Sequence, residues 1–170
     1  MSKKEAKKLT TQRLVLRRLM EQDIPFMSKM FGDGAVTKYL NGDTPPSDEH
    51  TMLKIVRARR ETEWAITLPD TDQFIGTALI PKITQNYLGE IGCVLLQEHW
   101  GKGYAKEVML TLMEYSKNVL KLGRLCAKID NNNTSSKKLF ESLGFTLDAL
   151  LPEAGFNGRI CDIAYYSMKL

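Results

Sequence analysis

Cysteine and histidine are scarce in this sequence. The three cysteines, Cys93, Cys126 and Cys161, are widely spaced without a C-x-x-C pair, and the only histidines are His50 and His99. An odd number of dispersed cysteines predicts neither a disulfide framework nor a zinc site. The strings H-E-x-x-H, G-x-S-x-G and G-x-x-x-x-G-K-S/T are absent, which removes the commonest metallohydrolase, serine hydrolase and P-loop chemistries. We expect reduced thiols and no metal ion.

Long apolar runs are also missing. No stretch approaches the roughly 18 consecutive apolar residues of a membrane span, and the start of the chain lacks the apolar core of a secretory signal. We therefore expect a cytoplasmic protein that binds no membrane. Among the 170 residues, 43% are apolar and 26% charged, which is typical of one globular domain with a hydrophobic core.

The net charge of +4 comes mainly from the first few residues. Residues 1–8 contain four lysines and one glutamate and carry +3, so the other 162 residues carry only +1. We expect a basic, flexible tail over residues 1–9 and a single domain over residues 10–170. The best internal basic run, residues 54–60, is followed by Glu61 and Glu63, as on a solvated helix face. Nucleic acid is therefore not an expected partner.

Hydrophobic periodicity and turn residues predict one mixed α/β domain. Helices are expected at residues 21–30, 47–60, 105–120 and 133–143, with a short helical turn at 33–40. Strands are expected at residues 13–19, 64–68, 73–80, 87–96, 124–129, 145–151 and 160–170. The order βααβββαβαββ predicts a central, mostly antiparallel sheet flanked by helices.

A glycine-rich segment, Trp100-Gly-Lys-Gly-Tyr-Ala105, joins a predicted strand to the strongest predicted helix. Such a turn directs several free backbone N–H groups and the positive end of the helix dipole at one point, and glycine leaves room for a bulky anion. This pattern is typical of a pyrophosphate cradle. It is equally typical of a plain strand-to-helix turn in which glycine supplies a positive φ.

The surroundings of this segment resemble the GNAT family of acetyl-CoA-dependent N-acetyltransferases, whose signature is Q/R-x-x-G-x-G/A. Trp100 departs from the first position of that signature, and the string W-G-K-G-Y-A is similar to the branch of RimJ/RimL-type ribosomal-protein N-terminal acetyltransferases. Further matches in the same order are Thr11–Arg17, Ile75-Gly76, Glu90-Ile-Gly92, Asn133–Ser136, Leu143-Gly-Phe145 and Asp162. The resemblance spans about residues 10–170 and implies a sheet with two splayed strands.

The resemblance implies acetyl-CoA as cosubstrate and assigns residues to it. Backbone groups of Val94, Leu95 and Leu96 would pair with the pantetheine arm as if it were an added strand. The pyrophosphate would be held by the amides of Gly101, Lys102, Gly103, Tyr104, Ala105 and Lys106. Asn133 and Ser136 would bind the pantetheine or the reacting end, although Asn133 is also a plausible helix N-cap.

The implied reaction is direct attack of an amine on the thioester, without a covalent enzyme intermediate. Glu90 is the candidate general base, acting through water, or else a group that binds substrate charge. The usual tyrosine acid of the family is replaced by Phe140, so that role does not carry over. Ser136 or water is the candidate proton donor, and Tyr104 is either another donor or a packing residue.

The acceptor is expected to be the α-amine of a peptide or protein N-terminus, because this amine is already partly neutral near pH 7.4. A small-molecule amine (aminoglycoside, polyamine or amino acid) and a non-catalytic acyl-CoA-binding module are the alternatives. Residues that either line an acceptor pocket or belong to the core are Tyr39, Asp43, Trp64, Tyr87 and Glu90. A monomer and a homodimer are both compatible with the sequence.

Overall fold

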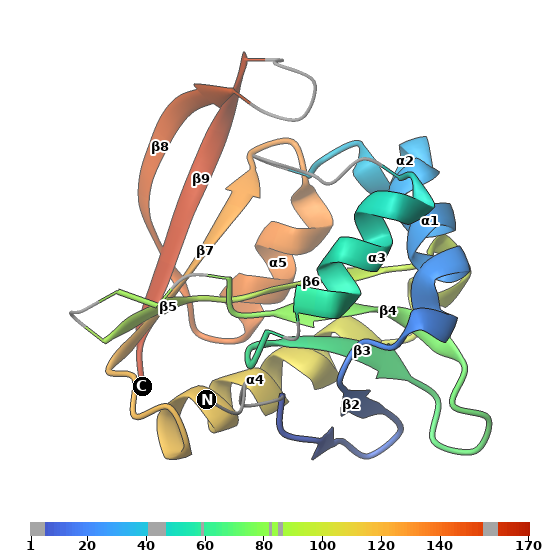
Figure 1. Ribbon diagram of the computed structural model, residues 1–170. Coiled ribbons are helices and arrows are strands. Elements are labelled where there is room, and N and C mark those ends of the chain that lie inside the picture. Colours follow the sequence, from blue (N-terminus) through green and yellow to red (C-terminus); the bar gives the residue numbers. More distant parts are fainter. Residues whose placement is uncertain (1–5, 41–46, 59, 82, 85–86, 155–159) are drawn as a thin grey trace.

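Two β-sheets that share one interrupted strand form the centre of the fold (Figure 1). The computed structural model describes residues 6–40, 47–58, 60–81, 83–84, 87–154 and 160–170. One sheet has the order β1-β2-β3-β4-β6 with antiparallel neighbours, and the other has the order β5-β7-β9-β8. In the second sheet β5 pairs with β7 in parallel, and the other pairs are antiparallel.

The strand predicted over residues 87–96 is divided between these two sheets. Its first part, β5 (Leu88–Glu90), pairs with β7 (Arg124–Asp130), and its second part, β6 (Gly92–Leu95), pairs with β4 (Phe74–Leu79). Ile91 lies at the division, where its N–H donates to the carbonyl of Cys126 at 3.0 Å. The prediction of one continuous strand is therefore wrong, because pairing with two different partners separates the halves.

Helices cover both faces of the five-stranded sheet. On β3 (Glu63–Thr67), Trp64 and Ile66 belong to the hydrophobic cluster under α4 (Tyr104–Asn118), whereas Ala65 belongs to the cluster under α1 (Ile24–Gly32) and α3 (Glu49–Ala58). This alternation is the two-residue period of a strand buried on both sides. The α4 cluster continues under α5 (Thr134–Ser142), and short helical turns lie at η1 (Glu21–Asp23), α2 (Gly34–Thr37) and η2 (Gln97–His99).

The N-terminal boundaries differ from the prediction. Strand β2 covers only Val15–Arg17, and a further strand, β1 (Leu9–Thr10), pairs with it. The buried indole of Trp64 donates to the carbonyl of Lys7 at 2.8 Å. Residues 7–9 of the predicted tail therefore belong to the folded domain, while residues 1–5 lie outside the described part of the chain.

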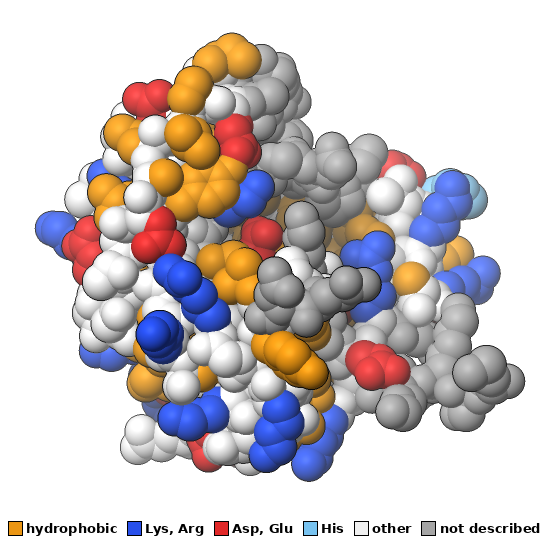
Figure 2. Space-filling view, turned by 90° about the vertical axis from the view of Figure 1, so that its left-hand side faces the viewer, with side chains coloured by type: hydrophobic (Ala, Val, Ile, Leu, Met, Phe, Trp, Pro, Cys, Tyr) orange, Lys and Arg blue, Asp and Glu red, His pale blue; other side chains and the backbone are white. Residues whose placement is uncertain are grey.

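The other predicted elements are confirmed with shifted ends. Helix α4 ends at Asn118 rather than at residue 120, and Val119, just beyond it, is 48% exposed. Strands β8 (Thr146–Ala154) and β9 (Ile160–Lys169) form a long hairpin with β8 at the sheet edge. Figure 2 shows apolar side chains gathered over this hairpin. Pro152 has no N–H to donate, which limits pairing of the β8 edge with another strand.

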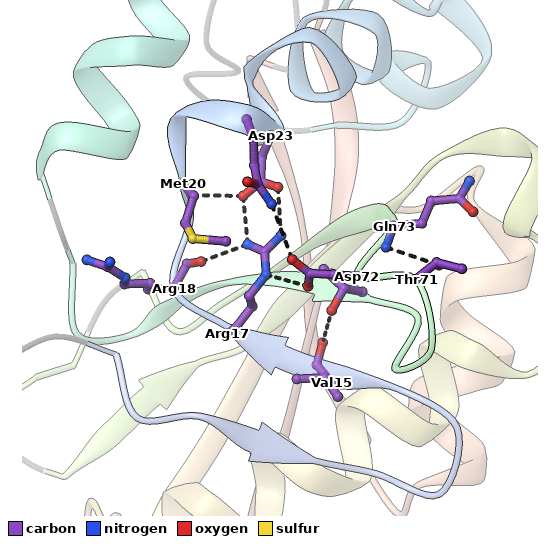
Figure 3. Close-up of polar contacts among 10 residues, drawn as sticks. Val15, Arg17, Arg18, Met20, Asp23, Thr71, Asp72 and Gln73 are labelled. Atoms are coloured by element: carbon purple, nitrogen blue, oxygen red, sulfur yellow. Dashed lines mark hydrogen bonds and ion pairs between the residues drawn. The ribbon is translucent and has the colours of Figure 1, made fainter.

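Arg17 joins the end of β2 to two other segments (Figure 3). Its Nη1 and Nη2 donate to the two carboxylate oxygens of Asp23 at 2.8 and 2.9 Å, and its Nε donates to Asp72 at 2.7 Å. Asp23 also accepts the N–H of Met20 at 2.8 Å. The guanidinium thus fixes the start of α1 and the β3–β4 hairpin against β2.

Candidate active site

Strands β6 and β7 run in the same direction and separate from each other (Figure 1). They part next to Ile91, and we call this point the fork. Beyond Cys126, β7 pairs on one side with β9, and β6 pairs on one side with β4. Among the described residues nothing pairs with the facing edges of β6 and β7, which confirms the expected splay. Helix α4 follows the end of β6, and α5 follows the end of β7, so two helix N-termini flank the opening.

The register of β6 decides which backbone groups face the opening. The N–H of Leu96 donates to the carbonyl of Ile75 at 2.9 Å, which directs Leu96 and, by alternation, Val94 toward β4. Leu95 and Cys93 consequently direct their backbone groups toward the opening. Of the three residues predicted to pair with pantetheine, only Leu95 faces the opening. Cys93 faces the opening as well, and the sequence did not single it out because the register with β4 is not visible there.

The glycine-rich segment forms an exposed turn directly before α4. Gly101 and Gly103 have φ values of 71° and 79°, so both need the conformational freedom of glycine. Gly103 is the N-cap of α4 without a side-chain capping bond, and a Cβ added to Gly101 would meet nothing within 4 Å. The turn therefore leaves the first N–H groups of α4 open to an anion, as the cradle interpretation requires. Lys102 and Lys106 are exposed beside it.

Trp100 links this turn to the open edge of β6. Its indole Nε1 donates to the carbonyl of Leu95 at 2.9 Å, while the residue as a whole remains 45% exposed. The neighbouring His99 is buried, and burial together with nearby Lys102 lowers its pKa, so its imidazole is held in the neutral form. The hydrogen bond from Trp100 to Leu95 therefore joins the turn to the strand edge.

Glu107, in the first turn of α4, forms hydrogen bonds and an ion pair with the β1–β2 turn. Its carboxylate accepts the backbone N–H of Arg13 at 2.7 Å, the Nε of Arg13 at 2.9 Å and the hydroxyl of Thr11. Burial acts to raise the pKa of Glu107, but these hydrogen bonds outweigh it and the pKa is lowered. The sequence could not pair Arg13 with Glu107, because 94 residues separate them.

Asn133 and Ser136 lie at the N-terminus of α5. The Oδ1 of Asn133 accepts the N–H of Ser136 at 3.1 Å, which confirms the N-cap interpretation. Within the described part of the chain, neither the Asn133 Nδ2 nor the Ser136 hydroxyl has a hydrogen-bond partner. The cap and a ligand-binding role are therefore compatible in the same residue.

Glu90 is the last residue of β5 and lies at the fork. A Cβ on Gly89 would point at Leu122 and Leu125 in the α4 cluster, so the alternation of the strand places Glu90 on the opposite face. Cys93 lies nearby in sequence, and burial raises the pKa of its thiol to about 12, which makes it a poor nucleophile. Glu90 therefore places a carboxylate at this point of the sheet.

The candidate aromatic residues have different environments. Trp64 is fully buried and packs edge-on against Tyr115, so it belongs to the core and does not line a pocket. Phe140 is likewise buried, edge-on against Phe145. Tyr104 packs against the guanidinium of Arg13, whose Cζ lies 4.7 Å from the ring centroid.

Tyr39 and Tyr87, which were also predicted as pocket residues, lie among the residues that the structure describes. Tyr87 is 63% exposed, and the ring of Tyr39 lies under the ammonium of Lys38 at 4.9 Å. Asp43 lies outside the described residues.

The described residues contain neither a cluster of metal-binding side chains nor a helix that could span a membrane. They contain no group of three or more histidine, cysteine, aspartate or glutamate side chains placed to hold a metal ion. Their helices are all too short or too polar to cross a membrane.

Comparison with known proteins identifies a family and relatives along the whole chain. Residues 13–146 match the model of the acetyltransferase (GNAT) domain. The uncharacterized N-acetyltransferase p20 of Bacillus licheniformis is 34% identical over 168 residues, 94% of each chain. The spermidine N(1)-acetyltransferase of Vibrio cholerae is 26% identical over 155 residues, covering 88% of this chain and 89% of its own.

Solved structures show the same fold. A GNAT-family acetyltransferase of Bacillus anthracis superposes with a TM-score of 0.83 at 22% identity, covering 96% of this chain and 98% of its own. The spermidine N-acetyltransferase of Vibrio cholerae in complex with CoA and spermine has a TM-score of 0.78 at 23% identity (92% and 95% covered). A ribosomal-protein-serine acetyltransferase structure from the same organism has a TM-score of 0.79 at 17% identity (96% and 98% covered).

The family match spans most of the chain, the relative from Bacillus licheniformis aligns over 94% of it, and the splayed strands and open helix N-terminus match the chemistry of that family. The chain therefore belongs to the GNAT family of N-acetyltransferases, enzymes that take the acetyl group from acetyl-CoA.

Proposed function

We propose that this enzyme acetylates the α-amine of a peptide or protein N-terminus, as the RimJ/RimL-type branch does. The observation that carries the cofactor part of the proposal is the continuous path from the exposed Gly101–Gly103 turn to the open edge of β6. A pyrophosphate at the N-terminus of α4 leaves the pantetheine arm free to run along that edge toward the fork.

The outward-facing backbone groups of Leu95 and Cys93 are the proposed partners of the pantetheine arm. A peptide-like chain can pair with them as an added strand, since these groups are directed away from β4. The carbonyl of Leu95 has a second lone pair beside the Trp100 indole, so both hydrogen bonds can coexist. Asn133 and Ser136, at the N-terminus of α5 across the opening, are the proposed ligands for the pantetheine arm.

The thioester end of the arm then lies at the fork, close to Glu90. The neutral amine attacks the carbonyl carbon, a carbon–nitrogen bond forms, and the carbon–sulfur bond breaks with release of CoA thiolate. Glu90, through a water molecule, takes the proton that the amine loses. The N–H of Cys93, the outward-facing residue of β6 nearest the fork, is the proposed donor to the oxyanion. The CoA thiolate can leave without first being protonated, so the reaction does not require a tyrosine acid at the position of Phe140.

The choice of an α-amine rests on the fraction of the amine that is already neutral near pH 7.4. An α-amine with a pKa near 8 is about one fifth neutral at pH 7.4, whereas a lysine-like amine is neutral only about once in 10³. A single carboxylate acting through water suits the first substrate better. The structure named for ribosomal-protein-serine acetylation and the spermidine N-acetyltransferase structure share this fold, so the fold does not choose between the two acceptors.

A polyamine is the second candidate acceptor. It is favoured by the relative and the solved structure that are named spermidine acetyltransferases. A thiol-release assay with a panel of short peptides, their N-terminally blocked forms, and free spermidine and spermine separates the two. Turnover of free peptides, but not of blocked peptides or polyamines, is the expected result. Turnover of polyamines alone would overturn the α-amine proposal.

The role of Glu90 is tested by Glu90→Gln, which removes the base with little change in shape. We expect kcat to fall about 10²-fold or more, while the Kd for acetyl-CoA stays within about twofold. Glu21→Gln is the matched control, because Glu21 forms only an exposed ion pair with Arg57. An unchanged kcat in Glu90→Gln would contradict the base role and favour substrate binding by this carboxylate.

A further inference from the structure

We propose that Arg13 is a ligand of the cofactor pyrophosphate, contributed by a segment outside the glycine-rich turn. This inference rests on the proposed location of acetyl-CoA at the N-terminus of α4. It adds a charged side chain to a subsite that would otherwise consist of backbone amides.

Three contacts hold Arg13 beside the turn. Its backbone N–H and its Nε both donate to Glu107, at 2.7 and 2.9 Å, and its guanidinium packs on the ring of Tyr104. Glu107 and Tyr104 belong to the first turn of α4. The position of the guanidinium is therefore fixed relative to the helix N-terminus, so little side-chain entropy remains to be lost on binding an anion.

The contacts leave the outer edge of the guanidinium unused. Within the described chain, neither Nη1 nor Nη2 of Arg13 has a hydrogen-bond partner, and the side chain is 47% exposed. Nη2 lies 3.4 Å from the position that a Cβ on Gly103 would occupy. Gly103 is the N-cap of α4, so the free N–H groups of Arg13 and of the helix are directed at the same region.

This arrangement suits an anion that offers two oxygens, such as a phosphate. A guanidinium is planar and always protonated, and its parallel N–H groups match two phosphate oxygens. Glu107 would repel an anion at this place, but its carboxylate is engaged by Arg13 and Thr11. The pyrophosphate is the part of acetyl-CoA that the cradle is proposed to hold, and it carries the oxygens that Nη1 and Nη2 can reach.

The alternative is that Arg13 only ties the β1–β2 turn to α4. Removing Arg13 would then weaken binding indirectly, either by loosening that turn or by leaving the Glu107 charge unpaired. The double variant Arg13→Ala/Glu107→Gln removes the unpaired charge, and Arg13→Lys keeps a cation without the planar fork. Melting temperatures of all variants report any loosening of the fold.

The test compares acetyl donors that carry different phosphates. For Arg13→Ala, we expect the Kd for acetyl-CoA to rise about tenfold or more by calorimetry, since one charge-assisted contact is lost. The same loss is expected for acetyl-dephospho-CoA, which keeps the pyrophosphate. With S-acetylpantetheine, which has no phosphate, kcat/KM should stay within about twofold. At saturating acetyl-CoA, kcat should also stay within about twofold.

Several results would overturn the inference. They are an unchanged Kd in Arg13→Ala, recovery of full affinity in the double variant, or an equal loss with S-acetylpantetheine. An effect that disappears with acetyl-dephospho-CoA would assign Arg13 to the 3′-phosphate and would also contradict the inference. If the wild-type enzyme bound no acetyl-CoA, the proposed function would fail instead, and this outcome is distinguishable from the others.

Discussion

Arg17 contacts two carboxylates that differ in burial, which makes the contribution of each measurable. Asp23 is 1% exposed and accepts two bonds from Arg17, whereas the side chain of Asp72 is 46% exposed. The hydrogen bond from Arg17 lowers the pKa of Asp72, so its carboxylate stays ionised at neutral pH. The same guanidinium therefore forms one buried and one solvent-exposed ion pair (Figure 3).

For Asp23→Asn we expect the free energy of unfolding to fall by about 3 to 5 kcal/mol, because the buried partner of Arg17 is removed and only the exposed carboxylate of Asp72 remains to balance its charge. Asp72→Asn, the matched control, should cost less than about 1 kcal/mol, because water screens the exposed pair. Urea denaturation of both variants measures the difference. Equal losses would show that burial does not determine the strength of this network.

Residue roles were predictable from the sequence where they depend on neighbours along the chain. The N-cap role of Asn133 is a local property, and the structure confirms it. The contact between Arg13 and Glu107 is not local, and neither is the bond from Trp64 to Lys7. The aromatic residue Trp64 was compatible with a pocket and with the core, because the sequence does not show that both faces of its strand are covered.

At the scale of elements, Gly76 allows β4 and β6 to approach closely at the edge of the opening. A Cβ on Gly76 would lie 2.2 Å from the carbonyl oxygen of Val94 and 2.8 Å from the Cδ2 of Leu95. Backbone would therefore have to move, which no rotamer change can avoid. Gly92 is the first residue of β6, and a Cβ added to it would meet nothing within 4 Å.

We expect Gly76→Ala to lower the free energy of unfolding by about 3 kcal/mol through strain in the β4–β6 pair. Gly92→Ala should change it by less than about 1 kcal/mol, in either direction. Chemical denaturation followed by circular dichroism compares the two. A Gly76→Ala variant as stable as Gly92→Ala would show that the close approach of these strands is not required.

The division of β5 from β6 could not be predicted, although most of the other elements were. Helix α4 was predictable because its apolar residues recur with helical period and fit one face. Residues 87–96 instead form one run of strand-forming residues, and only pairing with β4 and β7 separates them at Ile91. The register that turns Cys93 and Leu95 toward the opening has the same non-local origin.

At the scale of the molecule, the two sheets create the site by separating. The separated strands β6 and β7 are followed by the N-termini of α4 and α5, which converge on one opening. The carboxyl ends of strands in α/β folds are the usual place of ligand binding for this reason. The α4 cluster continues under both sheets, so the opening is supported by a continuous core.

The central claim is that this opening binds acetyl-CoA in the wild-type chain. Calorimetric titration of the purified protein with acetyl-CoA tests it most directly, with thiol release then measured in the same preparation against the amine panel. We predict saturable binding of one acetyl-CoA per chain, followed by amine-dependent release of CoA thiol. Binding without turnover of any amine would favour an acyl-CoA-binding module. An absence of binding would contradict the cradle and every role assigned around it.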